Sequence, residues 1–450
     1  MTQIKLIYTV LCGVEKIPDD SHLKQFPLFI SISVLKSGVP LYRCSIPATT
    51  DRTGRRNNIM PNEHRAMTPD FTDRAILHFD LDAFFVEVEL LRHTDLRGRP
   101  LLIGGGSERG VVASCSYEAR AFGVRSAMPM RRALQVCPEA VVLRGDMEAY
   151  SKQSAIVRKI IEAEAPLFEQ ASIDEFYLDL TGMDKYIGCW KWSLELREKI
   201  MHETGLPLSC GLSVNKTVSK VAAGEAKPRG TKLVPGGAEK DFLAPLSVGK
   251  LPSVGKETEK RLALLGVRTC GALSEMPVQI LEHEFGKHGI SIWKKANGED
   301  DSPVEPYREQ DSISSENTFQ TDTADVRFLH DELRHQTAKL AYELRSLNKL
   351  ASCVTIKLRY SDFNTFTRQA TIPYTAHDSL LVAKALDLFE QLYEKRQPVR
   401  LLGVRFSGLV PGSSQISLFE DTEKEGRLLA AMDRIRDKFG KGAVGKGGKG

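Results

Sequence analysis

The stretch ASIDEFYLDL (residues 171–180) places two acids, Asp174 and Glu175, side by side between apolar residues, with a third acid at Asp179. Adjacent carboxylates repel each other, and the repulsion costs more where water is scarce. The flanking apolar residues predict two strands that meet at Asp174 and Glu175. A bound cation would make the pair tolerable, whereas an exposed hairpin turn with two acids is the ordinary alternative.

A second acidic stretch, AILHFDLD (75–82), predicts a short strand. Asp80 and Asp82 share one face of it, because side chains alternate along a strand. Carboxylates on neighbouring strands could share hard divalent cations, since Mg²⁺ prefers oxygen ligands. Two such ions about 3.5–4 Å apart would hold the attacking and leaving oxygens of a phosphoryl transfer. The spacing alone leaves both the metal site and the hairpin turn open.

Two further stretches carry groups that suit phosphate. In SYEARAFGVRSAMP (116–129), Tyr117 and Arg120 are three residues apart and would share a helix face. An arginine can grip phosphate oxygens in a bidentate manner, and a tyrosine hydroxyl can add a hydrogen bond. In VNKTVSK (214–220), Lys216 and Lys220 are four apart and follow a strand. Solvated surface side chains are the alternative interpretation of both stretches.

The bulk composition sets the broad class. The 450 residues predict about three domains, and 42% hydrophobic with 27% charged residues is typical of a soluble globular protein. The formal net charge of +4 neither demands nor excludes nucleic acid. The 8 scattered cysteines form no CxxC pair, which argues against a zinc site and favours a reducing cytoplasm. No apolar run approaches the ~20 residues of a membrane span.

The C-terminal half has a legible order of elements. Strands are predicted at about 314–321, 353–360, 364–373 and 400–410, with helices at 326–350 and 377–394. This is the β-α-β-β-α-β order of a ferredoxin-like half-open sandwich. Residues 241–300 hold short helical segments punctuated by glycine. Residues 1–70 show only weak periodicity.

Five segments occur in a familiar order: HFDLDAFFVEVE, SYEARAFGVRSAMP, SIDEFYLDL, GLSVNKTVSKVAAGEAKPRG and LPSVGKETEKRLALLGVRTCG. Together they resemble the Y-family translesion DNA polymerases of the DinB type, from about Ala75 to the C-terminus. The resemblance implies an α+β, multidomain fold. Its expected parts are a ferredoxin-like palm with fingers, a helical helix-hairpin-helix thumb and a β-α-β-β-α-β little finger.

The resemblance also implies where the domains begin and end. Residues 1–70 are an extension of unknown role, for which disorder is one option. The expected order after it is palm and fingers at 71–240 (fingers about 84–145, inserted in the palm), thumb at 241–305, little finger at 306–410 and a flexible tail at 411–450. Met60 and Met67 precede the first strand, so the extension is either a misassigned start or an appended regulatory segment.

By the same resemblance, Asp80, Asp174 and Glu175 form the catalytic cluster. Asp80, Asp174 and the carbonyl of Leu81 would bind two Mg²⁺ ions, whereas Asp82 and Asp179 are expected to be structural. The reaction would be attack of a primer 3′-hydroxyl on a dNTP, error-prone and without proofreading. The dNTP would be held by Tyr117, Arg120 and Lys216. Phe85 matches a steric gate that excludes the 2′-hydroxyl of ribonucleotides, and Phe84 is assigned to core packing.

The resemblance places the remaining contacts outside the catalytic cluster. Expected DNA-binding residues are Gly255, Lys357, Arg359, Arg400 and Arg405. Ser253 stands where the family usually has glycine, a departure that bears on the thumb hairpin. In the tail, Gln415, Leu418 and Phe419 of QISLF resemble a peptide that docks on the sliding clamp.

The implied protein is a cytoplasmic monomer that acts on primer-template DNA and has no membrane contact. Two alternatives remain at this point. One is a catalytically inactive accessory paralogue that binds only DNA and clamp, which should lack some of the acids. The other is a nucleotidyl cyclase on a similar palm, which would need neither thumb nor duplex grip.

Overall fold

The computed structural model describes residues 29–34, 40–45 and 74–444, with gaps at 107–108, 186–187, 308, 394–396, 413–421 and 441–442. Residues Met1–Ala66 form a unit of their own. Within this unit, β1 (Phe29–Val34) and β2 (Pro40–Ser45) pair antiparallel, with Phe29 opposite Ser45. The expected N-terminal extension therefore contains a strand pair.

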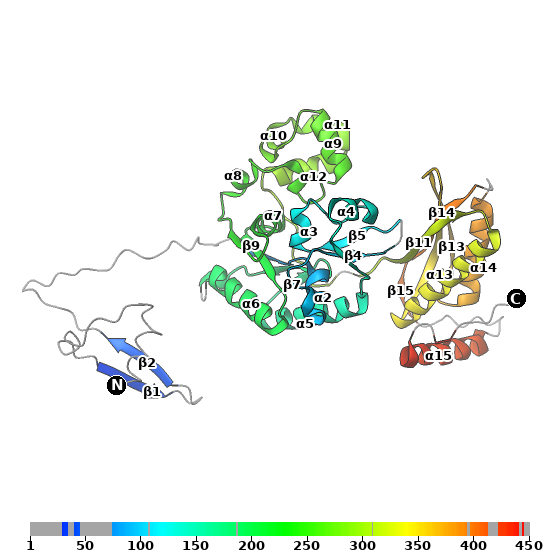
Figure 1. Cartoon of the computed structure of the whole chain (residues 1–450), viewed down its shortest axis with the longest axis horizontal. Coiled ribbons are helices and arrows are strands. Elements are labelled where there is room, and N and C mark those ends of the chain that lie inside the picture. The colour runs from blue at the N-terminus through cyan, green and yellow to red at the C-terminus, as the bar shows by residue number, and fades with distance from the viewer. Residues whose placement is uncertain are drawn as a thin grey trace, which may run out of the picture. The chain divides into compact units, whose positions relative to one another are not determined.

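The apolar run ILHFDL forms β3 (Ile76–Leu81), whose six residues are all buried. It lies at the centre of a five-stranded sheet with the order β10-β9-β3-β8-β7 (Figure 1). The other strands are β7 (Phe168–Gln170), β8 (Glu175–Asp179), β9 (Leu208–Ser213) and β10 (Thr231–Leu233). A strand buried on both faces must be covered by helices, which here are α2 (Phe84–Arg92), α5 (Met147–Glu164), α6 (Cys189–Thr204) and α7 (Lys216–Ala226). The strands β3, β7, β8 and β9 with α5 and α6 give the expected ferredoxin-like order.

A smaller three-stranded sheet is inserted between β3 and α5. Its order is β5-β4-β6, and a buried apolar cluster of its own lies beneath it. The elements are β4 (Leu101–Gly104), β5 (Val112–Cys115), β6 (Val141–Leu143), α3 (Tyr117–Ala121), α4 (Met130–Val136) and the 3-10 turn at Thr94–Leu96.

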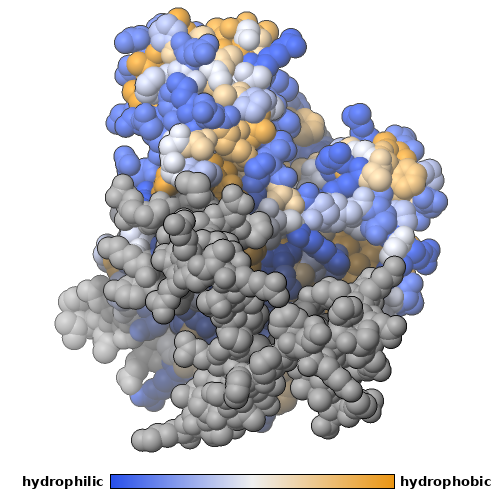
Figure 2. Space-filling view, turned by 90° about the vertical axis from the view of Figure 1, so that its left-hand side faces the viewer, coloured by the Kyte–Doolittle hydropathy of each residue, from blue (hydrophilic) through white to orange (hydrophobic). Residues whose placement is uncertain are grey.

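The glycine-punctuated segment after β10 is helical. It contains α8 (Glu239–Leu243), α9 (Lys256–Leu264), α10 (Cys270–Glu275), α11 (Val278–Phe285) and α12 (Lys287–Ala296), with a 3-10 turn at Val248–Lys250. Figure 2 shows hydrophobic areas at the top of the molecule, where these helices lie, among hydrophilic residues. Leu264 at the end of α9 is 87% exposed. None of the described helices is long and apolar enough to cross a bilayer.

The C-terminal region has the predicted β-α-β-β-α-β sequence of elements. They are β11 (Ser312–Thr323), α13 (Val326–Ser346), β12 (Lys349–Tyr360), β13 (Thr365–Thr375), α14 (Asp378–Leu392) and β14 (Val399–Ser407). The strands have the order β11-β14-β12-β13. The first strand is thus at an edge, whereas in the central sheet the first strand lies inside. The prediction of a second ferredoxin-like sheet is corrected in this respect: the element order agrees but the strand order does not.

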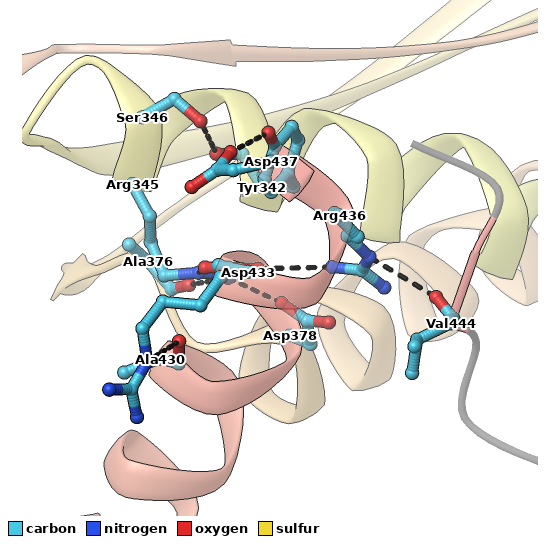
Figure 3. Close-up of polar contacts among 11 residues, drawn as sticks. Tyr342, Arg345, Ser346, Ala376, Asp378, Ala430, Asp433, Arg436, Asp437 and Val444 are labelled. Atoms are coloured by element: carbon cyan, nitrogen blue, oxygen red, sulfur yellow. Dashed lines mark hydrogen bonds and ion pairs between the residues drawn. The ribbon is translucent and has the colours of Figure 1, made fainter. Parts of the chain in front are cut away.

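Beyond β14, the short strand β15 (Val410–Pro411) pairs with β12, and α15 (Thr422–Phe439) packs on the C-terminal region. Arg345 of α13 binds Asp433 of α15 through Nε and Nη2, at 2.6 and 3.0 Å, and binds Asp378 through Nη1 at 2.6 Å (Figure 3). Asp437 accepts a hydrogen bond from Tyr342. A docked helix thus occupies residues 422–439, where the sequence also allows a helix at 423–439 within the tail.

The hairpin before α9 contains the residue that departs from the family pattern. Ser253 has φ +77°, in the left-handed region that disfavours a side chain. Its hydroxyl accepts a hydrogen bond from Lys295 Nζ at 3.2 Å. The hairpin therefore keeps a glycine-like backbone with a serine in it, at a conformational cost.

We expect Ser253→Gly to raise the free energy of unfolding by about 1 kcal/mol, because glycine adopts this φ without strain. Urea denaturation followed by circular dichroism measures the change. Ser253→Ala is the matched control, since it removes the hydroxyl but keeps the strained Cβ. A glycine variant no more stable than the alanine variant would contradict the expectation.

Candidate active site

The acidic residues of the two decisive stretches meet at one end of the central sheet. Asp80 of β3 lies directly opposite Glu175 of β8. The backbone N–H of Leu81 donates to the carbonyl of Asp174 at 3.0 Å, which fixes the turn between β7 and β8 against the end of β3. The three predicted carboxylates therefore belong to one cluster, because antiparallel pairing brings the two strand ends together.

The acidic cluster brings several negative charges together at a position that is partly shielded from water. Burial raises the pKa of Asp80 to about 6; Lys227 opposes this rise, while Glu175 and Asp174 add to it. Asp174 is more accessible and accepts a hydrogen bond from the Ser172 hydroxyl at 2.6 Å. Such a cluster favours a cation, since positive charge relieves the mutual repulsion.

Lysines from α7 and the segment after it supply positive charge in this structure. Lys220 Nζ lies 2.6 Å from Glu175, and Lys227 is ion-paired with Asp80. Helix α7 can lie this close to the sheet because Gly211 of β9 has no side chain: a Cβ there would stand 2.2 Å from the Ser219 carbonyl oxygen. Burial and the nearby lysines lower the pKa of His78 well below its usual value.

Lys216, which the sequence assigned to the triphosphate, lies elsewhere. Its ammonium is 2.8 and 2.7 Å from the two carboxylate oxygens of Glu169 and also donates to the carbonyl of Pro303. It lies over the Tyr177 ring at 4.7 Å. The structure thus brings Lys220 and Lys227 to the acids and leaves Lys216 on Glu169. In the sequence, Lys227 stands in KPRG, where the proline ends the helical pattern and nothing marks the lysine as a contact of Asp80.

Tyr117 and Arg120 do share a face of α3, as their spacing predicted. The Arg120 guanidinium lies over the Tyr117 ring at 4.6 Å, and its Nε donates to the Cys115 carbonyl at 3.2 Å. The Tyr117 hydroxyl donates to Asp82 at 3.3 Å. Both side chains are therefore held on the side of the inserted sheet that faces the acids.

Asp82 has the structural role that was expected of it. It is buried and accepts hydrogen bonds from Tyr117, from the Ser209 hydroxyl at 2.8 Å and from the Arg229 backbone N–H at 2.7 Å. Asp179 likewise accepts from the Thr181 backbone N–H at 2.9 Å. Neutral hydrogen-bond donors occupy the oxygens of both acids, whereas Asp80 and Glu175 are paired with lysines.

The two phenylalanines at the start of α2 point to different places. Phe84 is 3% exposed and belongs to the core, as predicted. Phe85 is partly exposed and stacks on Tyr150, with 4.4 Å between ring centroids and 13° between planes. The Tyr150 hydroxyl donates to Glu89 at 2.7 Å. Phe85 is thus a fixed ring at the start of α2, stacked on a buried tyrosine.

The donor set suits Mg²⁺ even though the carboxylates now contact lysines. Among the residues that the structure describes, no three His, Cys, Asp or Glu side chains are arranged around a common metal position. The available groups are nevertheless hard oxygen donors on rigid strand ends, which is what Mg²⁺ prefers. Burial raises the pKa of Asp80 to about 6, and the neighbouring carboxylates of Glu175 and Asp174 add to the rise.

The predicted basic residues of the C-terminal sheet have different partners. Lys357 binds Glu316, and Arg359 Nε donates to the Thr365 hydroxyl at 2.7 Å. Arg405 is exposed on the same outer face. Arg400 lies at an irregularity of the ladder and stacks over Phe363 at 4.6 Å, so it does not join that face.

Two predicted sites remain to be placed. Gly255 is the residue before α9, with φ −81°, and no side chain caps the first backbone N–H groups of that helix. Gln415, Leu418 and Phe419 lie outside the described residues.

Comparisons with known proteins cover most of the chain. Residues 79–224 match the impB/mucB/samB family, 310–418 match the C-terminal domain of that family, and 249–300 match a DNA polymerase-iota thumb domain. A DNA polymerase IV of Dehalococcoides mccartyi is 38% identical over 378 residues, covering 83% of this chain and 97% of that protein. One of Listeria welshimeri is 37% identical over 343 residues, covering 76% and 96%. A solved Y-family DNA polymerase chimera superimposes with a TM-score of 0.68 at 25% identity, covering 75% of this chain and all of that one.

Proposed function

The chain belongs to the impB/mucB/samB family of Y-family DNA polymerases, and from this premise we propose that it extends primers across damaged templates by two-metal phosphoryl transfer. The observation that carries the proposal is the meeting of Asp80, Asp174 and Glu175 at one sheet end, opposite Lys220 and Lys227. Acids on rigid strands, faced by cations, suit a reaction whose catalysis is mostly positioning and charge neutralisation.

We assign the groups as follows. Asp80, Asp174 and the Leu81 carbonyl would hold two Mg²⁺ ions, with Glu175 as the acidic partner. The ions, when bound, would supply positive charge at the reacting phosphate. Rigid pairing of β3 with β8 keeps the acids in register without reorganisation during the reaction. Phe85, backed by Tyr150, would lie under the sugar of the incoming nucleotide.

For the triphosphate we propose Tyr117, Arg120 and Lys227, with Lys227 in place of Lys216. Lys227 is at the acids, whereas Lys216 is held by Glu169 and Pro303. Lys227→Gln is expected to raise the KM for dNTP about tenfold, since a charge-assisted hydrogen bond contributes about 1.5–3 kcal/mol. Lys216→Gln is the matched control and should change that KM less than about twofold. Steady-state primer extension measures both, and the reverse order would restore Lys216 to the role.

The assay that tests the function is primer extension with Mg²⁺ and dNTPs. Templated extension supports a polymerase. An inactive accessory paralogue would bind primer-template without extending it, and a nucleotidyl cyclase would convert a nucleoside triphosphate without any primer. We extend the proposal to error-prone synthesis without proofreading; removal of mismatched 3′ ends by the purified protein would contradict that part.

We further propose that residues 71–240 act as palm and fingers, 241–305 as thumb and 306–410 as little finger. The duplex would be gripped by backbone groups near Gly255 and by Lys357, Arg359 and Arg405, with Arg400 at the rim.

We also propose that the protein is a cytoplasmic monomer. Gel filtration at several concentrations checks the oligomeric state, and a concentration-dependent shift to a dimer would contradict it.

The clamp peptide remains part of the proposal on its sequence alone. Leu418 and Phe419 would fill an apolar pocket and Gln415 would hydrogen-bond. Changing Leu418 and Phe419 to alanine is expected to remove binding to a bacterial sliding clamp in a pull-down. Leu428→Ala, an exposed leucine on α15, is the control and should leave binding intact. Undiminished binding of the double variant would exclude this peptide.

A further inference from the structure

An acid and a lysine meet across three strands on the outer face of the C-terminal sheet. Strand β14 lies between β11 and β12, and its residue Gly403 pairs with Glu316 on one side and with Lys357 on the other. The Lys357 ammonium lies 2.9 Å from each carboxylate oxygen of Glu316. The three residues therefore form one row across the sheet, which we call the Glu316–Lys357 row.

The missing side chain of Gly403 makes this row possible. A Cβ at that position would stand 2.7 Å from Cγ of Glu316 and 3.4 Å from its Cβ. Glu316 therefore lies across the middle strand in space that any other residue would occupy. The glycine is in extended strand with no left-handed φ, so conformational freedom does not account for it. The absence of a side chain at Gly403 allows Glu316 to reach Lys357 two strands away.

The surroundings of the row are basic or uncharged. Arg405 is two residues along β14 and Arg359 two residues along β12, both on this outer face. The neighbours of Glu316 on the same face of β11 are Ser314 and Thr318. A negative charge in this position opposes any phosphate that approaches the two arginines. An exposed ion pair contributes little to stability, so the row is better explained by what the face binds.

We propose that Glu316 holds Lys357 in the free protein and that Lys357 exchanges this carboxylate for a DNA phosphate on binding, so that Glu316 weakens the grip of the sheet on duplex DNA. This inference rests on the proposed function, in which the sheet contacts primer-template. The exchange replaces one anion by another, and the net gain is small while Glu316 keeps its charge. Without that charge, Lys357 contributes a full phosphate contact.

The test is Glu316→Gln, which keeps the size of the side chain and removes its charge. Fluorescence anisotropy with a labelled primer-template, over a range of salt concentrations, measures affinity. Binding is expected to be about 3–10-fold tighter near 0.1 M salt, and the slope of log K against log salt steeper by about 0.9, the value for one further phosphate contact. Asp387→Asn is the matched control: this exposed acid on α14 is bound by Lys384 and Gln391, away from the sheet face. It should leave both quantities unchanged.

A double variant separates the specific exchange from a general charge effect. Lys357→Gln in the Glu316→Gln background should abolish the whole gain, because the gain requires the ammonium that Glu316 holds. A gain that persists without Lys357 would overturn the inference. If the unmodified protein fails to bind primer-template, the proposed function itself fails, and that outcome is distinct from these.

Gly403→Ala tests the same exchange without changing net charge. The new Cβ displaces Glu316 and leaves Lys357 in place. Tighter binding with a steeper salt slope is expected here too, and circular dichroism checks that the sheet is intact. Unchanged binding in both Glu316→Gln and Gly403→Ala would overturn the inference.

Discussion

Asp174→Asn is expected to reduce primer extension by at least about 10³-fold while primer-template binding is retained. Asp174 is at the turn that meets the end of β3, beside Asp80 and Glu175, and its backbone carbonyl holds Leu81. The substitution keeps that backbone contact and removes only a carboxylate charge. Loss of a metal ligand removes several kcal/mol of transition-state stabilisation, and each 1.36 kcal/mol is tenfold in rate.

The control for this experiment is Asp179→Asn, the same chemical change five residues along the chain. Asp179 accepts a hydrogen bond from Thr181 and lies at the other end of β8, opposite Ile76, so its variant should extend primers at close to the normal rate. Single-turnover extension with excess enzyme gives the rate, and anisotropy gives the DNA affinity. Extension by Asp174→Asn within tenfold of the unmodified protein would exclude Asp174 as a catalytic group.

Phe85→Ala is expected to lower discrimination against ribonucleotides about 10²-fold or more. The Phe85 ring is fixed by stacking on Tyr150, so it cannot turn away from a 2′-hydroxyl. Removing the ring opens the space that the 2′-hydroxyl needs, so this single substitution removes the whole steric barrier. The measurement is the ratio of kcat/KM for dNTP to that for the matching rNTP.

Phe84→Leu is the control for the gate. Phe84 is buried in the core, so its variant should lose about 1 kcal/mol of stability with no change in sugar discrimination. A Phe85→Ala enzyme that rejects ribonucleotides as well as the unmodified protein would remove the gate assignment. A change in discrimination in the Phe84 variant alone would transfer the role to Phe84.

Much of the site could be predicted because its residues lie at the ends of strands. Short apolar runs in ILHFDL and EFYLD specify two strands, and period-2 geometry then fixes where Asp80 and Glu175 point. The shared face of Tyr117 and Arg120 followed from helical spacing, whereas the choice between Phe84 and Phe85 rested on the family resemblance. These features need only information within a few residues.

The partners of the lysines could not be predicted from local sequence patterns. Lys216 and Lys220 share a helix face by spacing, but which acid each one meets depends on the direction in which α7 crosses the sheet. That direction depends on the close approach at Gly211 of β9, a strand that the sequence does not by itself place beside α7. Lys227 follows the end of the helix and reaches Asp80 across 147 residues of sequence. No pattern in KPRG indicated that contact.

The sequence by itself determined the strand ends that carry the acids, the order of elements in both sheets and the glycine before α9, because each depends on short-range periodicity and backbone preference. Tertiary structure alone decided the strand order β11-β14-β12-β13, the docking of α15 through Arg345 and Asp433, and the partners of Lys216, Lys227 and Lys357. These depend on which surfaces pack together. A charged side chain finds its partner only after distant strands and helices have been brought within a few ångströms of each other.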